Sequence, residues 1–274
     1  MIVYSATKQE FQKDIMSNDI AKIIARSYKQ ATGRRTGDSE MQSWQNSLQY
    51  VDRVLNDDAI PSDAGVAIEY HIPQSAKRID FILSGKNAEQ EDTAILIELK
   101  QWQEARLTEK DGTVSTRFKH GEKETAHPSY QVWSYKCLIE DYNQTIQDEV
   151  INLVPCAYLH NYERDDAIEH PFYEKYLESA PVFLKDDALK LREFIKRHVK
   201  YGDTSNVMYR IDSGKIRPSK NLADQLESML SGNQEFVLID DQKVAYETIL
   251  AAAKEVSANP DKKIAIIIEG GPGN

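Results

Sequence analysis

The chain has 274 residues, of which 41% are hydrophobic and 28% are charged, and its net charge is −10. This composition is ordinary for a soluble globular protein with a sizeable core, and no apolar run approaches the ~20 residues of a membrane-spanning helix. The acidic balance excludes a protein that coats nucleic acid mainly through phosphate contacts, but an enzyme with a small nucleic-acid footprint remains open.

The cysteines and the N-terminus indicate the compartment. Cys137 and Cys156 are far apart in the sequence, and two cysteines are too few for a disulfide framework or a zinc site. The first residues lack the basic start, apolar stretch and cleavage site of a signal peptide. We therefore expect a reducing, cytoplasmic location.

Two helices are predicted at the start of the chain. The first covers residues 8–31, and a glycine-bearing turn follows it. The second begins with a capping-box pattern, Ser39 and Gln42. Its apolar residues recur at helical spacing: Trp44, Leu48, Val51 and Leu55. Glu40 lies four residues before Trp44 and is therefore predicted to point along the buried stripe of this helix.

The middle of the chain predicts an α/β fold with a mixed central sheet flanked by helices. Three strands are expected first, the first two as a hairpin: Val66–Ile72, Lys77–Leu83 and Thr93–Leu99. Residues 103–127 show no clear period and are interpreted as a long loop or an irregular insert. Four further elements are expected, a helix, two strands and a second helix: Pro128–Tyr142, Val150–Leu159, Val182–Leu184 and Asp187–His198.

From Lys200 the sequence becomes polar and glycine-bearing, as a linker would be. The elements expected beyond it are a helix with Leu222, Leu226 and Leu230, a short apolar segment Phe236–Ile239, a helix Gln242–Val256 and a strand Lys263–Ile268. The predicted organisation is a domain over 1–200, a connecting segment over 201–235 and the start of a second domain over 236–274.

Three charged residues sit on the predicted strands. Glu98 and Lys100 are two positions apart at the end of an apolar strand, so both side chains leave the same face, and Asp80 can lie beside them if the strands pair. Two carboxylates bind Mg²⁺ or Mn²⁺ through oxygen, and a lysine adds positive charge near a phosphate. The alternative is that these are ordinary strand residues, with Glu98 and Lys100 as a same-face ion pair.

The strand-borne Asp80 and the Glu98-x-Lys100 pair resemble the PD-(D/E)XK nuclease superfamily, whose restriction-endonuclease-like core has this order of elements over residues 39–159. Ile79 stands where the family often has proline. Gln131 and Tyr135 form the Q-x-x-x-Y pattern of the RecB-like branch on the next helix. The resemblance implies that Asp80, Glu98, Lys100, Gln131 and Tyr135 are catalytic and that Mg²⁺ or Mn²⁺ is the cofactor.

Two further acids are open to more than one interpretation. Glu40 resembles the metal-binding acid that the first helix contributes in these nucleases, so the implied metal set is Glu40, Asp80 and Glu98. An acid favoured by the dipole at a helix N-terminus is an equal alternative. Glu69, on the preceding strand, is either an extra ligand or a solvent-facing residue.

The last residues, IAIIIEGGPG, resemble the beginning of a P-loop, whose backbone amides cradle phosphates. Together with Gln242, which resembles an adenine-reading glutamine, they look like the opening of a Schlafen group 3-type DNA/RNA helicase domain of a bacterial nuclease–helicase protein. Gly270, Gly271 and Gly273 would form part of the nucleotide site. The P-loop lysine is absent, so ATP is expected only in a longer parent protein, of which the chain looks like a truncated piece.

The function expected from these patterns is metal-dependent hydrolysis of nucleic acid, DNA rather than RNA, coupled to a helicase. The alternative is a non-cleaving module that binds nucleic acid and feeds it to the helicase. Two basic clusters could meet phosphates, although each taken alone is better explained as a solvated face. They are Lys22, Arg26, Lys29, Arg34 and Arg35, and then Arg106, Lys110, Arg117, Lys119 and Lys123.

Overall fold

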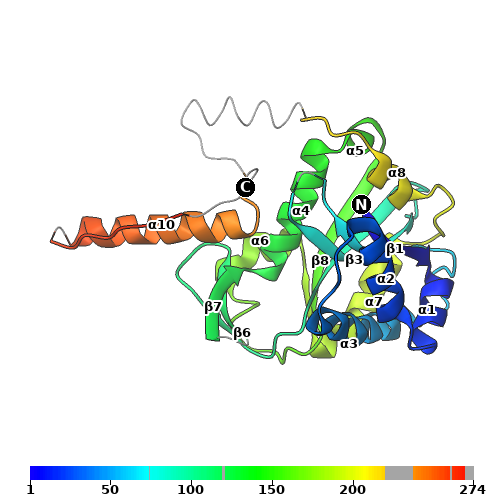
Figure 1. Cartoon of the computed structure of the whole chain (residues 1–274), viewed down its shortest axis with the longest axis horizontal. Coiled ribbons are helices and arrows are strands. Elements are labelled where there is room, and N and C mark those ends of the chain that lie inside the picture. Colours follow the sequence, from blue (N-terminus) through cyan, green and yellow to red (C-terminus); the bar gives the residue numbers. More distant parts are fainter. Residues whose placement is uncertain (74, 119–120, 220–236, 260, 269–274) are drawn as a thin grey trace.

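The computed structural model describes residues 1–73, 75–118, 121–219, 237–259 and 261–268. Within these residues the chain is an α/β protein with a six-stranded mixed sheet, a small three-stranded antiparallel sheet and flanking helices (Figure 1). The expected α/β class with a mixed central sheet is confirmed. Among the described residues, no helix combines the length and the apolar character that crossing a bilayer requires.

The large sheet has the strand order β1-β2-β3-β4-β8-β9. Its first four strands are antiparallel, whereas β8 and β9 run parallel to β4. The bounds are β1 Ile2–Thr7, β2 Gly65–His71, β3 Arg78–Lys86, β4 Asp92–Lys100, β8 Ile151–Leu159 and β9 Val182–Leu184. The predicted strands are thus confirmed to within a few residues, and β1 is an edge strand that was not predicted.

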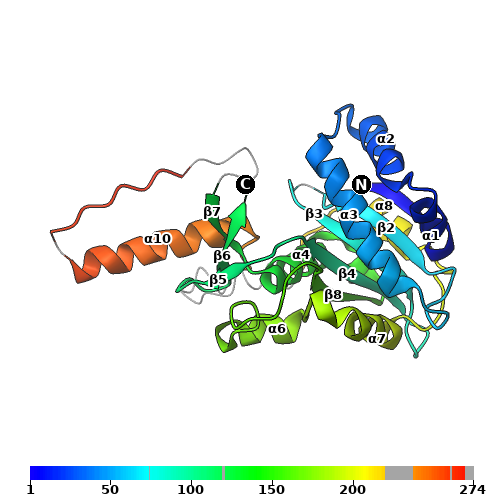
Figure 2. The same ribbon diagram turned by 90° about the horizontal axis from the view of Figure 1, so that it is seen from below.

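Helices cover both faces of this sheet. On one face, apolar residues of the sheet pack against α1 (Lys8–Met16), α2 (Ile20–Thr32), α3 (Asp38–Leu55) and α7 (Ala188–His198). On the other face they pack against α4 (Pro128–Tyr142) and α8 (Val207–Ser213). Two short helices, α5 (Gln144–Asp148) and α6 (Glu174–Ser179), lie near α4. Figure 2 shows this arrangement from below.

The N-terminal helix prediction was wrong in two details. Residues 8–31 form two helices rather than one, because the chain turns between Met16 and Ile20, where Asn18 has a φ of 57°. The third helix begins one residue before Ser39, with Gly37 at its N-cap and no side-chain capping hydrogen bond. A capping box does occur, but at α1, between Thr7 and Glu10.

The predicted loop over 103–127 is instead the small sheet, formed by β5 (Ala105–Leu107), β6 (Thr113–Phe118) and β7 (Gly121–Ala126). Its exposed face is charged, and cross-strand pairs such as Arg106–Glu122, 3.0 Å apart, replace the apolar alternation that a strand prediction uses. Val114 is fully buried and anchors the sheet beneath α4 and α6.

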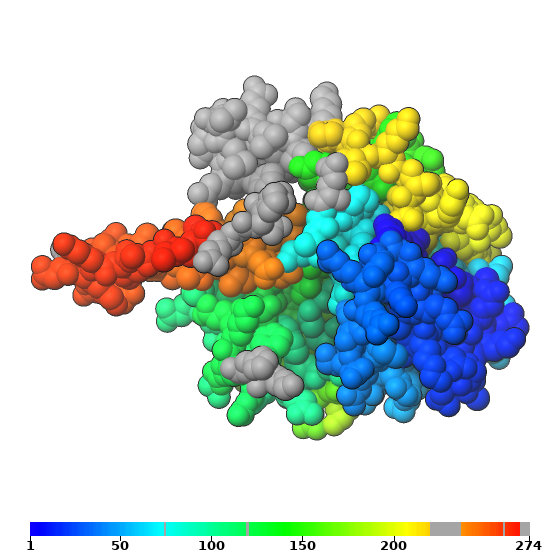
Figure 3. All heavy atoms as spheres, viewed as in Figure 1, coloured from blue at the N-terminus to red at the C-terminus, as the bar shows by residue number. Residues whose placement is uncertain are grey.

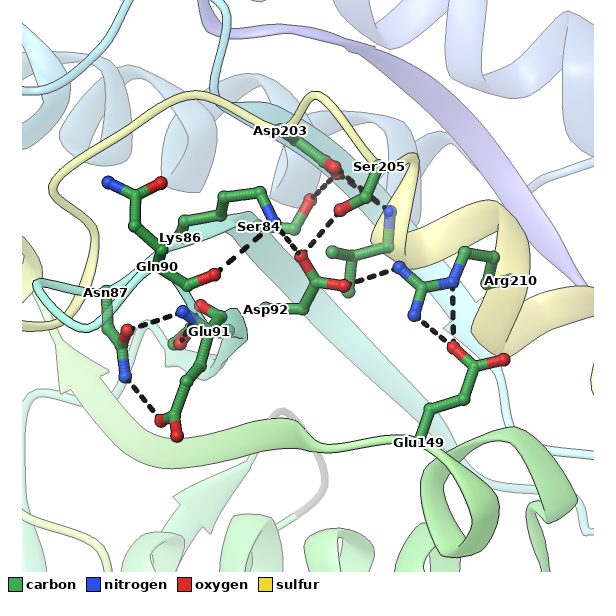
Figure 4. Close-up of polar contacts among 12 residues, drawn as sticks. Ser84, Lys86, Asn87, Gln90, Glu91, Asp92, Glu149, Asp203, Ser205 and Arg210 are labelled. Atoms are coloured by element: carbon green, nitrogen blue, oxygen red, sulfur yellow. Dashed lines mark hydrogen bonds and ion pairs between the residues drawn. The ribbon is translucent and has the colours of Figure 1, made fainter.

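Residues 201–219 were interpreted as part of a linker, but residues 201–213 pack against the large sheet and residues 215–219 hydrogen-bond to the segment of α4 and α5. Figure 4 shows the polar network that holds residues 201–213. Asp92 on β4 accepts hydrogen bonds from Ser205 (2.6 Å) and Arg210 (2.5 Å), and Ser84 on β3 donates one to Asp203 (2.6 Å). Burial opposes ionisation of Asp92, but hydrogen bonds from Arg210, Lys86 and Ser205 lower its pKa to about 2. The predicted domain boundary at residue 200 stays a prediction.

Near the C-terminus the helix prediction was right and the strand prediction was wrong. Helix α10 spans Asp241–Ala258. Lys263–Ile268 forms no strand and pairs with neither sheet among the described residues, and Ile267 is 87% exposed. Residues 237–239 form no strand either. Two predicted features lie outside the described residues: the helix with Leu222, Leu226 and Leu230, and the apolar residue Phe236.

Candidate active site

Adjacent strands bring Asp80, Glu98 and Lys100 together. On β4, Ala94 and Leu96 face α4, whereas Ile95 and Ile97 face α1 and α3. Because side chains alternate along a strand, Glu98 and Lys100 continue the α4-facing row. Strand β3 pairs with β4 up to Phe81 and Ile97, so Asp80 stands at the point where the ladder ends. The predicted juxtaposition of the three residues therefore occurs in the structure.

Their contacts form a compact polar group. The Lys100 ammonium lies 2.6 Å from Oε1 of Glu98, and the amide of Leu99 donates a hydrogen bond of 2.8 Å to Oδ2 of Asp80. The side chains of Glu98 and Lys100 are 3% and 17% exposed. Oε2 of Glu98 is buried and has no hydrogen-bond partner among the described residues. A buried carboxylate oxygen without a partner is costly, and a bound cation would relieve that cost.

Two buried carboxyl groups next to one ammonium disturb each other's ionisation. Burial, followed by repulsion from Asp80, raises the pKa of Glu98, and Lys100 only partly opposes this rise. Burial also raises the pKa of Asp80, against the opposing effects of Lys100 and the Leu99 amide. Burial alone would lower the pKa of Lys100, but Glu98 and Asp80 reverse this and raise it. Lys100 is thus held as an ammonium beside the two carboxyl groups.

The Q-x-x-x-Y residues face this group from α4. Pro128 lies in the first turn of α4, and one helical turn separates Gln131 from Tyr135, so both lie on one face. Nε2 of Gln131 donates a hydrogen bond of 3.0 Å to the Tyr135 hydroxyl. Burial raises the pKa of Tyr135, and Glu98 and Asp240 add to this rise, which indicates that the hydroxyl is close to both carboxylates. The catalytic role of these two residues stays a prediction.

Asp240 belongs to the same site and was not predicted. It immediately precedes α10, with a φ of 42°, and its Oδ2 accepts hydrogen bonds from Tyr135 (2.9 Å) and Lys77 (3.0 Å). Lys77 also lies 2.5 Å from Asp241. The sequence signal was only an acidic pair before a helix. Contact between residues 105 positions apart cannot be read from that pattern.

The other two candidate acids share Arg78. Glu40 lies 2.5 Å from Nη1 of Arg78, and Oε2 of Glu69 lies 2.9 Å from Nε of Arg78. Glu69 is 2% exposed and also accepts a hydrogen bond of 2.6 Å from Trp44. The solvent-facing interpretation of Glu69 was therefore wrong. Glu40 contacts a guanidinium, and the structure does not bring it against Asp80 and Glu98.

Asp80 and Glu98 are the residues that could hold a metal ion. In the described part of the chain, no three or more His, Cys, Asp or Glu side chains are grouped as a metal-binding set. Mg²⁺ and Mn²⁺ commonly take one or two carboxylates and complete their coordination with water and substrate phosphate. The unpartnered Oε2 of Glu98 and the raised pKa of this carboxyl group, which a bound cation would lower, fit such an ion.

The predicted nucleotide-binding residues are described only in part. Gln242 lies in the first turn of α10, where its Oε1 accepts a hydrogen bond of 3.1 Å from the amide of Ile239. This contact ties the segment before α10 to the first turn of the helix. Gly270, Gly271 and Gly273 lie outside the described residues, so an ATP site stays a prediction.

Comparison of the chain with protein-family models, with curated proteins and with solved structures finds no match.

Proposed function

We propose that this chain is a divalent-metal-dependent nuclease of the PD-(D/E)XK type. One observation carries the proposal: Asp80, Glu98 and Lys100 lie together at the ends of neighbouring strands, and Gln131 and Tyr135 face them from α4. An isolated E-x-K triplet is common. Its combination with a third charged residue on the paired strand and with a polar pair on the facing helix is a specific arrangement.

The order of elements adds support. A helix (α3) precedes the β2–β3 hairpin that carries Asp80, β4 carries Glu98 and Lys100, and α4 leads to the parallel strand β8. This is the restriction-endonuclease-like order, and the small sheet β5–β7 is an insertion between β4 and α4. A link to a helicase that uses ATP belongs to the proposal as well, carried by the likeness of residues 236–273 alone.

The side chains suggest a division of labour in hydrolysis. Asp80 and Glu98 would hold Mg²⁺ or Mn²⁺, which when bound acidifies a water molecule and neutralises charge on the phosphate. Lys100 is an ammonium, because Glu98 and Asp80 raise its pKa, so it orients the attacking water and stabilises developing negative charge rather than accepting a proton. Gln131 and Tyr135 offer hydrogen-bond donors that position the phosphodiester.

A second candidate function is a non-cleaving module that binds nucleic acid. The engagement of Glu40 with Arg78 favours it, because it leaves two carboxylates rather than three at the candidate metal site. Such a module retains DNA without cutting it and shows no metal dependence.

One cleavage experiment distinguishes the two candidate functions. Wild type, Lys100→Ala and the control Lys190→Ala are incubated with single- and double-stranded DNA and RNA in Mg²⁺, Mn²⁺ or EDTA. Lys190 is 71% exposed and lies on α7, away from this site. The nuclease proposal expects metal-dependent cleavage that Lys100→Ala loses and Lys190→Ala keeps. Equal products from all three proteins, or none from wild type, contradict it.

A further inference from the structure

The two basic clusters of the sequence differ in their surroundings. In the cluster on the small sheet, cations lie beside acids of neighbouring strands: Arg106 with Glu122 (3.0 Å), Lys110 with Glu124 (2.5 Å) and Arg117 with Glu104 (3.9 Å). Lys119 lies outside the described residues. These pairs neutralise three of the four described cations of that cluster, all except Lys123, so it offers less charge to a phosphate.

The cluster on α2 has no such neutralisation. Lys22, Arg26 and Lys29 are spaced by four and three residues and therefore share one face of α2, and Arg34 and Arg35 follow in the loop. All five side chains are exposed, and residues 20–37 contain no Asp or Glu. Lys22 pairs with Asp19 at 2.9 Å. Over the described ranges, no carboxylate forms an ion pair with Arg26, Lys29, Arg34 or Arg35.

Helix stability does not account for this charge. Cations near a helix C-terminus are favoured by the macrodipole, which applies to Lys29, Arg34 and Arg35. Arg26 lies in the middle of α2 and gains nothing from the dipole, and Lys22 lies in the first turn, where a cation is unfavourable. A cationic face on a chain with a net charge of −10 produces a local field of the opposite sign, which attracts a polyanion.

Helix α2, which carries this face, and the loop after it are connected to Arg78 on β3. The ring of Tyr28 on α2 lies 6.0 Å from that of His71, and His71 pairs with Arg78 across the β2–β3 ladder. The basic loop also leads directly into α3, where Glu40 contacts Arg78. Arg78 precedes Asp80 by two residues, and α2 lies beside α3 (Figure 2). Contacts of Tyr28 and Glu40 thus connect α2 and the basic loop with the strand that carries Asp80.

We propose that the α2 basic face, defined as Lys22, Arg26, Lys29, Arg34 and Arg35, binds the sugar-phosphate backbone of nucleic acid and leads it to Asp80 and Glu98. The direction towards Asp80 and Glu98 rests on the nuclease proposal, whereas the binding itself does not. Arginine and lysine contacts to phosphate carry no base specificity and release condensed counterions. Binding through this face is therefore sequence-independent and steeply salt-dependent. Figure 3 views the molecule with the N-terminal helices in blue.

The test compares two triple variants that remove the same positive charge. One is Arg26→Ser, Lys29→Ser and Arg34→Ser on the α2 basic face. The other is Lys13→Ser, Arg197→Ser and Lys200→Ser, three exposed side chains elsewhere. Binding of fluorescein-labelled single- and double-stranded DNA is followed by anisotropy in EDTA over a range of NaCl. Because each phosphate contact contributes about 0.7 to 0.9 to the slope of log K against log[salt], the first variant flattens the slope by about 2 to 3. The control variant keeps the wild-type slope.

Equal slopes in the two variants would show that total charge governs binding and would overturn the inference. The inference would also be overturned if the wild type did not bind DNA but bound vesicles containing phosphatidylserine, since the face would then bind a membrane surface. A wild type that binds DNA through this face but never cuts it contradicts the nuclease proposal and leaves this inference standing. A wild type that cuts DNA equally well without the α2 basic face supports the nuclease proposal and contradicts this inference.

Discussion

The hydroxyl of Tyr135 donates a hydrogen bond of 2.9 Å to Oδ2 of Asp240, a residue 105 positions later in the chain. Lys77 holds the same carboxylate oxygen at 3.0 Å. Through these contacts the segment before α10 places the Asp240 carboxylate beside Gln131 and Tyr135. This carboxylate is also close enough to Glu98 to contribute to the raised pKa of Glu98. The C-terminal helix is thereby tied to the candidate active site.

Replacement of Asp240 by alanine is expected to increase the cleavage rate. The change frees the Tyr135 hydroxyl for substrate and removes a carboxylate that repels phosphate. A hydrogen bond to a charged group contributes about 1.5 kcal/mol, which corresponds to roughly a tenfold change in rate. The measurement is single-turnover cleavage of DNA in Mg²⁺. Asp241→Ala is the matched control, since Asp241 contacts Lys77 and makes no hydrogen bond to Tyr135. A loss of cleavage in Asp240→Ala alone would show that Asp240 takes part in the chemistry.

Arg78→Ala is expected to destabilise the fold, because it leaves Glu69 buried without its cation. Breaking a fully buried pair costs about 3 to 5 kcal/mol, and the 37% exposure of Arg78 reduces our expectation to about 2 kcal/mol. The free energy of unfolding is measured in urea. Arg106→Ala removes a 69% exposed partner of Glu122 and should change it by less than about 0.5 kcal/mol. Similar losses in both variants would mean that the Arg78 pair is no stronger than a surface ion pair.

The metal-free protein should lose stability as the pH rises from about 4.5 towards 8. Burial and Asp80 raise the pKa of Glu98 to about 8, so over this range the folded state keeps a proton that the unfolded state has released. For one such proton the free energy of unfolding falls by about 1.4 kcal/mol per pH unit. Glu98→Gln should flatten this dependence and be more stable than wild type at pH 8. The free energy of unfolding is measured in urea with EDTA across this pH range. If its slope against pH is the same in Glu98→Gln as in wild type, the assignment to Glu98 is refuted.

Arg210→Ala is expected to loosen residues 201–213 without altering cleavage. Arg210 links α8 to Asp92 on β4 and to Glu149 (Figure 4), at the end of β4 opposite Glu98. Limited proteolysis should become faster between residues 200 and 219, while the Mg²⁺-dependent rate stays at the wild-type value. Resistance equal to wild type would indicate that Val207, Met208 and Ile211 hold the segment by packing alone.

The central part of the fold could be predicted because its patterns are local. The α4-facing row of β4 and the proline at the start of α4 define their elements without reference to the rest of the chain. The small sheet could not be predicted, because ion pairs such as Arg106–Glu122 stabilise it across strands and leave no apolar alternation. Lys263–Ile268 shows the reverse case, since its apolar residues favour a strand but it pairs with neither sheet among the described residues.

In the candidate site, too, local patterns could be predicted and long-range contacts could not. Asp80, Glu98 and Lys100 could be placed together from spacing and strand pairing, because each sits on a strand. Gln131 and Tyr135 were placed with them only by the resemblance to the RecB-like nucleases. The contacts that depend on long-range packing could not be read from the sequence. Asp240 reaches Tyr135 from the segment before α10, and Arg78 joins Glu40 to Glu69 across α3, β2 and β3.

The most direct test of the nuclease proposal compares two buried glutamates on the same sheet. Glu98 and Glu69 are each 2% exposed and each has a raised pKa, but only Glu98 lies beside Lys100, whereas Glu69 contacts Arg78 and Trp44. The measurement is the Mg²⁺-dependent cleavage rate of DNA by wild type, Glu98→Gln and Glu69→Gln. We predict that Glu98→Gln loses at least about a thousandfold in rate, as removal of a key electrostatic group does, whereas Glu69→Gln stays within about tenfold. Wild-type cleavage by Glu98→Gln, or equal losses in both variants, would contradict the proposed metal-dependent mechanism.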